Sequence, residues 1–298
     1  MFSSYIANGV YCYRTAGSLY YALYMLTFLR VSRPRFWIYL LGPFLLGAAA
    51  AFQTGTGTFS AAALFLGLYF TLPANLLIYG VNDIFDYDTD VINEKKKGYE
   101  PLVLRTQHRS LWRVIALSNI IFIPLLFILD LRTILVCASF LFLGYFYSVP
   151  PIRAKARPFL DSAFNALYVM PGIAAYFAFG GTSLNLSLVA AGIFWSAAMH
   201  AYSAVPDIDA DKVAGIPTVA TTLGAKNTLI LCLLFYIAAG VIAGLTVGTI
   251  GWVGLGVYAV LMLFSLRSST HQALMTTYKR FPTINAIMGA LLFFSIIL

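Results

Sequence analysis

The chain has 298 residues, of which 60% are hydrophobic and only 10% are charged, and its mean hydropathy is +0.84. A soluble domain carries about 25% charged residues, so this composition excludes a soluble globular protein and places the chain in a lipid bilayer. The formal net charge of +8 could indicate an anionic partner, and the distribution of the basic residues tests that alternative.

The chain opens with an apolar and aromatic segment, "SLYYALYMLTFLRVSRPRFW" at 18–37, which ends in arginines. This pattern predicts an interfacial helix within residues 1–35 that lies along the cytoplasmic face of the membrane. A tenth membrane span is the alternative. No basic region followed by an apolar core and a cleavage site stands at the start, so no cleaved signal peptide is expected.

Long apolar runs without acidic or basic residues then follow one another along the whole chain. They lie at 36–52, 59–81, 114–129, 133–148, 162–180, 184–205, 228–248, 250–266 and 283–298. A helical span needs about 20 apolar residues, and the runs show no alternation of apolar and polar positions, which favours helices over a barrel. The sequence thus predicts an all-α polytopic membrane protein with nine transmembrane helices in a single domain, 1–298. Pro73, Pro124 and Pro171 predict kinks within the spans.

The basic residues alternate with the spans. Of the 19 Lys and Arg residues, 18 fall before the first span or after the second, fourth, sixth and eighth spans, and Arg132 alone falls on the other side. By the positive-inside rule, the N-terminus and these loops are cytoplasmic and the C-terminus is outside. Because topology accounts for the net charge, no nucleic-acid partner is expected.

Acidic residues concentrate where the second span ends, in "YGVNDIFDYDTDVINEKKKGYE" at 79–100. At about 100° per residue, a continuous helix would place Asp83, Asp86 and Asp90 on one face and Asn82 on its flank. Asp88 would point away.

A second acidic segment, "AVPDIDADKVAGIPTVATTLG", follows the sixth span. Asp207 and Asp211 lie one helical turn apart, and Asp209 is opposed to them. Oxygen ligands without histidine or cysteine favour Mg²⁺, which typically binds one or two carboxylates together with substrate phosphates. Two carboxylate stripes with nearby lysines (Lys95, Lys96, Lys97, Lys212) predict a site for Mg²⁺ and a diphosphate. The alternative is that both segments are merely hydrated acidic linkers.

These motifs resemble those of a known family. "NDIFDYDTD" is similar to the N-D-x-x-D-x-x-x-D motif of the UbiA superfamily of intramembrane prenyltransferases, and "DIDAD" to its second motif, D-x-x-x-D. "YSVPPIRAK" at 147–155 resembles the basic double-proline stretch after the family's fourth span. The resemblance implies nine helices around a central cavity that cytoplasmic loops cap. It also implies transfer of a prenyl group from an allylic diphosphate to a lipophilic acceptor.

Carried over to the matching positions, the resemblance assigns three groups of site residues. The Mg²⁺ ligands would be Asn82, Asp83, Asp86, Asp90, Asp207 and Asp211. The diphosphate contacts would be Lys95, Lys96, Arg153, Lys155 and Lys212. Tyr147 would lie near the reacting allylic carbon and act, with the aspartates, in catalysis.

The subfamily is indicated by further stretches. "SRPRFWIYLLGP" at 32–43, "NEKKKGYE" at 93–100 and "SAVPDIDADKVAGIPT" at 203–218 resemble the lycopene elongase branch, which makes bacterioruberin-type carotenoids. Quinone-forming members usually carry Arg-Pro-Leu after the first motif, whereas Glu100 precedes Pro101 here. Precursors of quinones, haem, chlorophyll or archaeal lipids remain alternative acceptors.

Other functions and residues stay open from the sequence. A transporter is the non-enzyme alternative, although its charges would be expected near the bilayer midplane; an inactive scaffold is the third. His200 lies seven residues before Asp207 and could face the cavity, either as a buried, hydrogen-bonded histidine, which is the favoured interpretation, or as a catalytic base. Asp161 and Asn165 could cap or line the cavity and are assigned no role. The scattered cysteines (Cys12, Cys137, Cys232) are interpreted as packing thiols.

Overall fold

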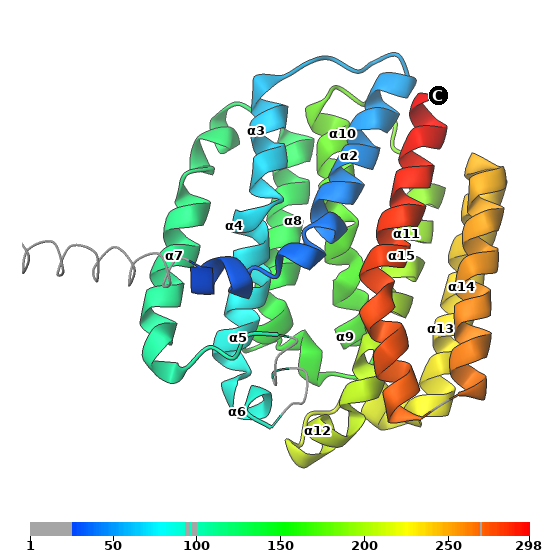
Figure 1. The fold of residues 1–298 in the computed structure, drawn as a ribbon. Helices are drawn as coiled ribbons and strands as arrows, with labels where there is room; N and C mark the ends of the chain where they lie inside the picture. Colours follow the sequence, from blue (N-terminus) through cyan, green and yellow to red (C-terminus); the bar gives the residue numbers. More distant parts are fainter. Residues whose placement is uncertain (1–25, 93–95, 97–99, 269) are drawn as a thin grey trace, which may run out of the picture.

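All regular secondary structure in the computed structural model is helical across the part of the chain it describes, namely residues 26–92, 96, 100–268 and 270–298 (Figure 1). The first described helical segment, Leu26–Phe36, is bent by 56° from the helix that follows it. Residues 1–25, which hold most of the expected interfacial helix, lie outside the described residues.

The helices follow the order of the apolar runs. They are α2 (Ile38–Gln53), α3 (Ala61–Tyr69), α4 (Leu72–Asn75), α5 (Val81–Phe85), α6 (Tyr87–Asp90), α7 (His108–Ile120), α8 (Leu131–Ser148), α9 (Leu160–Ala163), α10 (Met170–Ala178), α11 (Leu186–Ala204), α12 (Ile208–Val213), α13 (Val219–Val247), α14 (Thr249–Arg267) and α15 (His271–Ile297).

The number of spans differs from the nine expected. Among the described residues, seven helices are long and apolar enough to cross a membrane, and the bent pair before and within α2 makes up to eight. The run at 162–180 is present but divided into α9, a 3-10 segment (Phe164–Tyr168) and α10. Pro171 stands in the first turn of α10, where its missing N–H cannot continue a helix from the preceding residues. The all-helical polytopic fold is confirmed.

The second apolar run, Ala61–Phe85, is one irregular span. It consists of α3, α4, a π-helical turn (Leu76–Gly80) and α5, and Pro73 stands in the first turn of α4. At Asp86 the backbone leaves helical geometry, with φ −106° and ψ 7°, and α6 begins at the next residue. The first acidic motif is therefore carried by two short helices rather than one.

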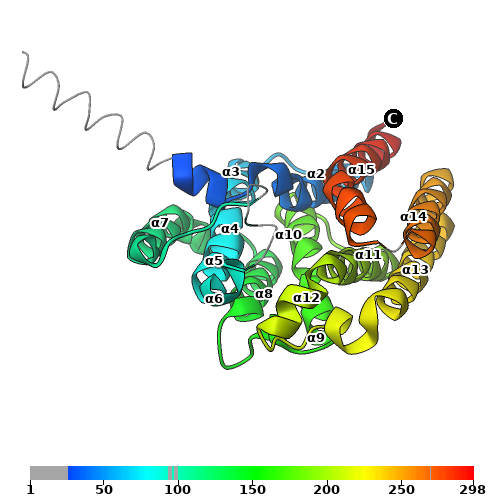
Figure 2. The ribbon, with the colours of Figure 1, turned by 60° about the horizontal axis from the view of Figure 1, so that its bottom comes forward.

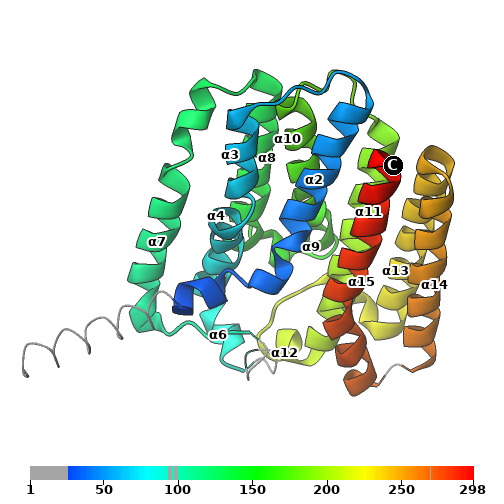
Figure 3. The same ribbon diagram turned by 45° about the horizontal axis from the view of Figure 1, so that its top comes forward.

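Both acidic segments lie at the same end of the molecule. Figures 1 and 3 show α6 and α12 at one end, and the α2–α3 connection and the C-terminus at the other. Viewed with that end forward, α5, α6, α12, α11 and α15 are arranged around the interior (Figure 2). Helices from distant parts of the sequence thus bring the two motifs toward a common interior.

Close helix packing holds this arrangement. α2 packs on α10 and α15, and α11 packs on α13, which in turn packs on α14. The α2–α10 contact depends on two glycines, because a Cβ built on Gly47 would lie 1.9 Å from the carbonyl oxygen of Gly172. Small residues at such crossings allow helix backbones to approach closely within a membrane.

Candidate active site

A cavity of about 220 Å³ lies between the two acidic segments. Its charged lining comes from both acidic segments, from the segment before α2 and from the stretch after α8. These residues are Arg33, Asp86, Asp90, Lys96, Glu100, Lys155, Asp207 and Asp211. Another part of its lining, the aromatic wall, is aromatic and apolar: Phe36, Tyr39, Ile78, Tyr79, Leu167, Tyr168, Met199, Tyr278 and Pro282. The two acidic helix ends therefore share one pocket, as the sequence analysis required.

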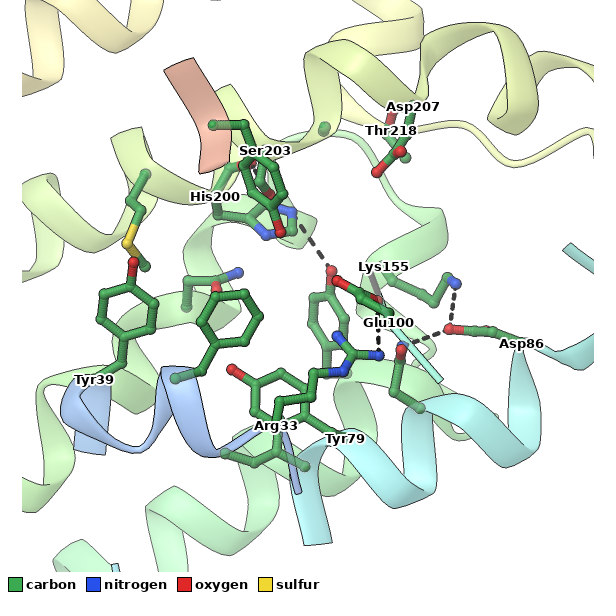
Figure 4. Close-up of a pocket in the computed structure, with 18 of the residues that line it drawn as sticks. Arg33, Tyr39, Tyr79, Asp86, Glu100, Lys155, His200, Ser203, Asp207 and Thr218 are labelled. Carbon is green, nitrogen blue, oxygen red and sulfur yellow. Dashed lines mark hydrogen bonds and ion pairs between the residues drawn. The ribbon is translucent and has the colours of Figure 1, made fainter. Parts of the chain in front are cut away.

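Asp86 lies where α5 gives way to α6, and its side chain is almost fully buried at 2% exposure. Its Oδ2 forms an ion pair with Lys155 and accepts a hydrogen bond from the Asn82 amide. Arg153 lies 3.9 Å from Oδ1, but no hydrogen bond reaches that oxygen. Figure 4 shows Asp86 and Lys155 together on one side of the pocket. The carboxylate thus presents an unsatisfied oxygen within the site.

Asp90 is held by Lys96, whose Nζ lies 2.9 Å from its Oδ2. Burial raises the pKa of Asp90 to about 6, although the Lys96 charge acts in the opposite direction. Nearby Asp83 and Asp86 raise the pKa further. The negative charge of this pocket is consequently only partly compensated by the protein's own cations.

Asp83 does not follow its predicted position. Its side chain is fully buried and does not line the cavity; instead it pairs with Arg33 at 2.8 Å and Lys96 at 2.6 Å. The helical-wheel argument assumed one continuous helix, whereas α5 ends at Phe85 and α6 begins at Tyr87. Asp83 and Asp90 nevertheless converge on one ammonium, since Lys96 Nζ lies 2.6 Å from Asp83 and 2.9 Å from Asp90. Asp83 thus anchors Arg33 and Lys96, which line the pocket, and Asn82, expected on the flank, lines it as well.

The second motif is carried by a short 3-10 segment (Val205–Asp207) and α12. Asp207 and Asp211 line the cavity. Asp209 is exposed, on the opposite side as expected. Lys212 is also exposed and is not among the lining residues, so its contact with diphosphate stays a prediction.

The remaining basic residues divide between the pocket and its edge. Lys96 and Lys155 line the cavity. Arg153 does not, and its side chain is 41% exposed. Lys95 lies outside the described residues. Arg33 and Glu100, which sequence reasoning did not assign to the site, face each other across 3.0 Å and line the pocket.

The side chains that line the cavity are of the types that bind a divalent cation, but they are not yet close enough together to hold one. Five carboxylates (Asp86, Asp90, Glu100, Asp207, Asp211) and three cationic side chains line the cavity, and a buried Asp86 oxygen has no hydrogen-bond partner. Within the described ranges, however, no three Asp, Glu, His or Cys side chains lie close enough to hold one ion. Excess negative charge with oxygen-only ligands is the environment that Mg²⁺ prefers.

A separate polar group lies on the cavity wall. Tyr147, at the end of α8, has its hydroxyl 3.5 Å from Nε2 of His200 on α11. Asp161 Oδ2 lies 4.0 Å from the same nitrogen. The expectation that His200 faces the cavity is confirmed, and Asn165 lines it as well.

Aromatic side chains of the wall were not identifiable from the sequence, since 24 Phe and 19 Tyr offered no way to select them. The Tyr79 hydroxyl lies 3.2 Å from that of Tyr168, and the Arg33 guanidinium lies 4.5 Å from the centroid of the Tyr79 ring.

Cys137 and Cys232 form no disulfide, as expected, and Cys12 lies outside the described residues.

Comparisons with known proteins agree with this geometry. The chain is 39% identical to the lycopene elongase/hydratase of Haloarcula japonica, over 88% of this chain and 87% of that protein. It is 29% identical to the lycopene elongase/hydratase of Corynebacterium glutamicum, over 88% of this chain and 93% of that one.

Solved structures share the fold. A UbiA homologue from Archaeoglobus fulgidus bound to DMAPP and Mg²⁺ superposes with a TM-score of 0.69 at 20% identity, covering 91% of this chain and 99% of that one. The apo UbiA homologue from Aeropyrum pernix gives a TM-score of 0.67 at 21% identity, with 89% and 98% coverage.

The model of the UbiA prenyltransferase family matches residues 40–297. With its helical spans, its shared acidic pocket and these relatives, the chain is an integral membrane enzyme that belongs to the UbiA prenyltransferase family.

Proposed function

We propose that this enzyme transfers a dimethylallyl group from dimethylallyl diphosphate to lycopene or a closely related carotenoid, with Mg²⁺ as its cofactor. The observation that carries the proposal is the single cavity that joins the two acidic motifs to an aromatic wall. Its relatives named lycopene elongase/hydratase support the acceptor, and the solved homologue that holds DMAPP and Mg²⁺ supports the donor and the metal.

The charged end of the cavity suits a diphosphate. Lys155 beside Asp86, and Lys96 beside Asp90, place ammonium groups next to carboxylates in the same pocket. Mg²⁺ would be held by oxygens of Asp86, Asp90, Asp207 and Asp211, with Asn82 as a further candidate. When bound, Mg²⁺ supplies positive charge that stabilises the leaving diphosphate.

The aromatic wall suits the prenyl chain and the cation that bond cleavage generates. A site that excludes water prevents premature capture of an allylic cation, and an aromatic face stabilises a nearby cation by about 0.5–2 kcal/mol. Tyr79, Tyr168 and Tyr39 line this part of the pocket. The terminal double bond of the acceptor would then attack the allylic cation and leave a tertiary cation on the acceptor.

The orientation in the membrane belongs to the same proposal. Both acidic motifs lie at one end, opposite the C-terminus (Figure 1), and the basic residues concentrate in the connections at the motif end. We infer that this end faces the cytoplasm, where a water-soluble diphosphate is available.

The test uses the purified full chain in lipid vesicles with radiolabelled dimethylallyl diphosphate and either lycopene or an aromatic acid as acceptor. We expect label in a lycopene product and its loss on chelation of Mg²⁺. Label only in an aromatic product would refute the proposed acceptor, and label in neither would refute the donor.

Two matched pairs of variants test the site. Asp86→Ala and Asp207→Ala should each lower turnover by about 100-fold or more, the usual cost of losing a group that stabilises a developing charge. Asp88→Ala and Asp209→Ala, which remove exposed neighbours in the same motifs, should retain activity. Equal activity across all four variants would reject the assignment of the metal site.

A further inference from the structure

Among the described residues, His200 is the only histidine that lines the cavity, and no role in binding the metal, the diphosphate or the prenyl group has been assigned to it. It is carried by α11. Six residues separate it from Asp207, an aspartate of the second motif that lines the same pocket. Its side chain is 13% exposed. A neutral imidazole has one ring nitrogen that can accept a proton.

A carboxylate held in a fixed position lies beside His200. Asp161 is buried, and its two oxygens accept hydrogen bonds of 2.7 Å from the backbone N–H groups of Ser162 and Val219. These bonds hold the carboxylate in a fixed position with Oδ2 4.0 Å from His200 Nε2. Because a buried carboxylate is stabilised by a nearby positive charge, a proton arriving at His200 would be favoured by Asp161.

His200 lines the reaction chamber together with Tyr147 and Asn165. The Tyr147 hydroxyl lies 3.5 Å from His200 Nε2. Asn165 also lines the cavity, and its side-chain amide donates a hydrogen bond of 2.8 Å to the backbone carbonyl of Asp161. An enclosed water needs two to four polar partners, about three on average. His200, Tyr147 and Asn165 offer such partners on a wall built from α8, α11 and the α9–α10 segment, whereas Asp86 and Lys155 lie at the charged side (Figure 4).

We propose that His200 is the general base for hydration of the final carbocation, with the buried Asp161 carboxylate stabilising the charge that His200 gains. This inference rests on the proposed function. After the new carbon–carbon bond has formed, the oxygen of a water molecule bonds to the tertiary cation on the acceptor. The water's O–H bond breaks, its proton passes to His200 Nε2, and the product is a tertiary alcohol. His200 then returns the proton to solvent, so the net reaction adds one water per prenyl transfer.

Without the base, the same cation loses a C–H proton and gives an alkene. The two products differ in mass by one water, which makes their ratio a direct measure of the proposed step. General-base assistance typically contributes about 10²–10⁴-fold to a rate, so the ratio should respond strongly to His200.

The experiment measures diphosphate release and the alcohol-to-alkene ratio in lipid vesicles containing lycopene and dimethylallyl diphosphate, with H₂¹⁸O identifying oxygen taken from water. His200→Gln keeps a polar side chain of similar size but cannot accept the proton. We expect diphosphate release within about threefold of the unmodified enzyme and an alcohol-to-alkene ratio lower by about 100-fold. His271→Gln, at the exposed start of α15, is the matched control and should leave both readouts unchanged.

His200→Asn is the second variant, and a retained unfolding midpoint identifies a folded protein. Three outcomes would overturn the inference. The product ratio could stay unchanged in a folded variant, diphosphate release could fall as much as the ratio, or the unmodified enzyme could form only the alkene. Absence of diphosphate release from the unmodified enzyme would instead overturn the proposed function, on which the hydration step rests.

Discussion

Arg33 provides a sharp test of how the pocket is held together, because it is buried against acids far away in the sequence. Its guanidinium lies 2.8 Å from Asp83 and 3.0 Å from Glu100, and the side chains are 9%, 0% and 6% exposed. At an effective dielectric of about 20, each contact represents about 5–6 kcal/mol of gross attraction. Desolvation of the charges offsets much of this attraction, so the gross value is not the stability that the pair contributes.

Replacing one partner of a buried ion pair costs about 3–5 kcal/mol, since the other charge remains buried without compensation. We expect Arg33→Met to fall near the lower end, about 3 kcal/mol, because Lys96 stays 2.6 Å from Asp83. The measurement is the free energy of unfolding of the full chain in mixed detergent micelles. The double variant Arg33→Met/Glu100→Gln should recover part of the loss, because it also removes a buried charge that keeps only the longer contacts with Lys96 at 3.8 Å and Arg35 at 3.9 Å.

Arg105 is the matched control. It pairs with Asp88, but the two side chains are 65% and 84% exposed, and exposed pairs contribute about 0–1 kcal/mol. Arg105→Met should therefore lower the free energy of unfolding by less than about 1 kcal/mol. If Arg33→Met and Arg105→Met cost the same, burial of the Arg33 network does not determine its contribution, and the reasoning is refuted.

Three further outcomes are expected. Lys155→Met removes the cation that pairs with Asp86 and should raise KM for the allylic diphosphate by about tenfold or more, as loss of a charged hydrogen-bonding partner does; an unchanged KM would place the diphosphate elsewhere. Gly47→Ala puts a Cβ 1.9 Å from the Gly172 carbonyl and should cost about 1–3 kcal/mol of unfolding free energy, whereas Gly256→Ala, with open space, should be neutral or stabilising; similar thermal shifts would contradict this. Asp130 caps α8 by accepting hydrogen bonds from the N–H groups of Arg132 and Thr133, so Asp130→Ala should cost about 1 kcal/mol at neutral pH. Although burial acts to raise it, the pKa of Asp130 is lowered by these bonds and by the Thr133 hydroxyl, so the stabilisation is present above the ordinary carboxyl pKa and is lost as the pH falls below it. A cost that does not shrink in acid would contradict the capping role.

The sequence predicts the spans and the shared acidic pocket because both depend on composition and on spacing along one segment. The gathering of Asp86, Asp90, Asp207 and Asp211 around one cavity follows from two motifs at the ends of spans on the same side. The burial of Asp83 could not be derived, because it depends on the ion pair with Arg33, which comes from a different segment of the chain.

Contacts between distant segments were also beyond the sequence. Arg33 stands 50 positions before Asp83. Its position before the first apolar run is as compatible with an arginine that only sets the membrane topology as with one that lines the pocket. The group of Tyr147, His200 and Asp161 draws on three segments. Tyr147 lies in a motif, but nothing in the sequence pairs it with His200 or Asp161, and only the tertiary fold brings the three together.

The size of the chamber has a consequence for the order of events. A space of about 220 Å³ suits a five-carbon donor and the tip of an acceptor, but not the whole length of a carotenoid. On the proposed acceptor, most of the polyene must stay among the lipid tails while one terminus is modified. A molecule elongated at both termini would therefore have to withdraw, turn end for end and enter again, so the singly extended species should accumulate first whenever the substrate is in excess.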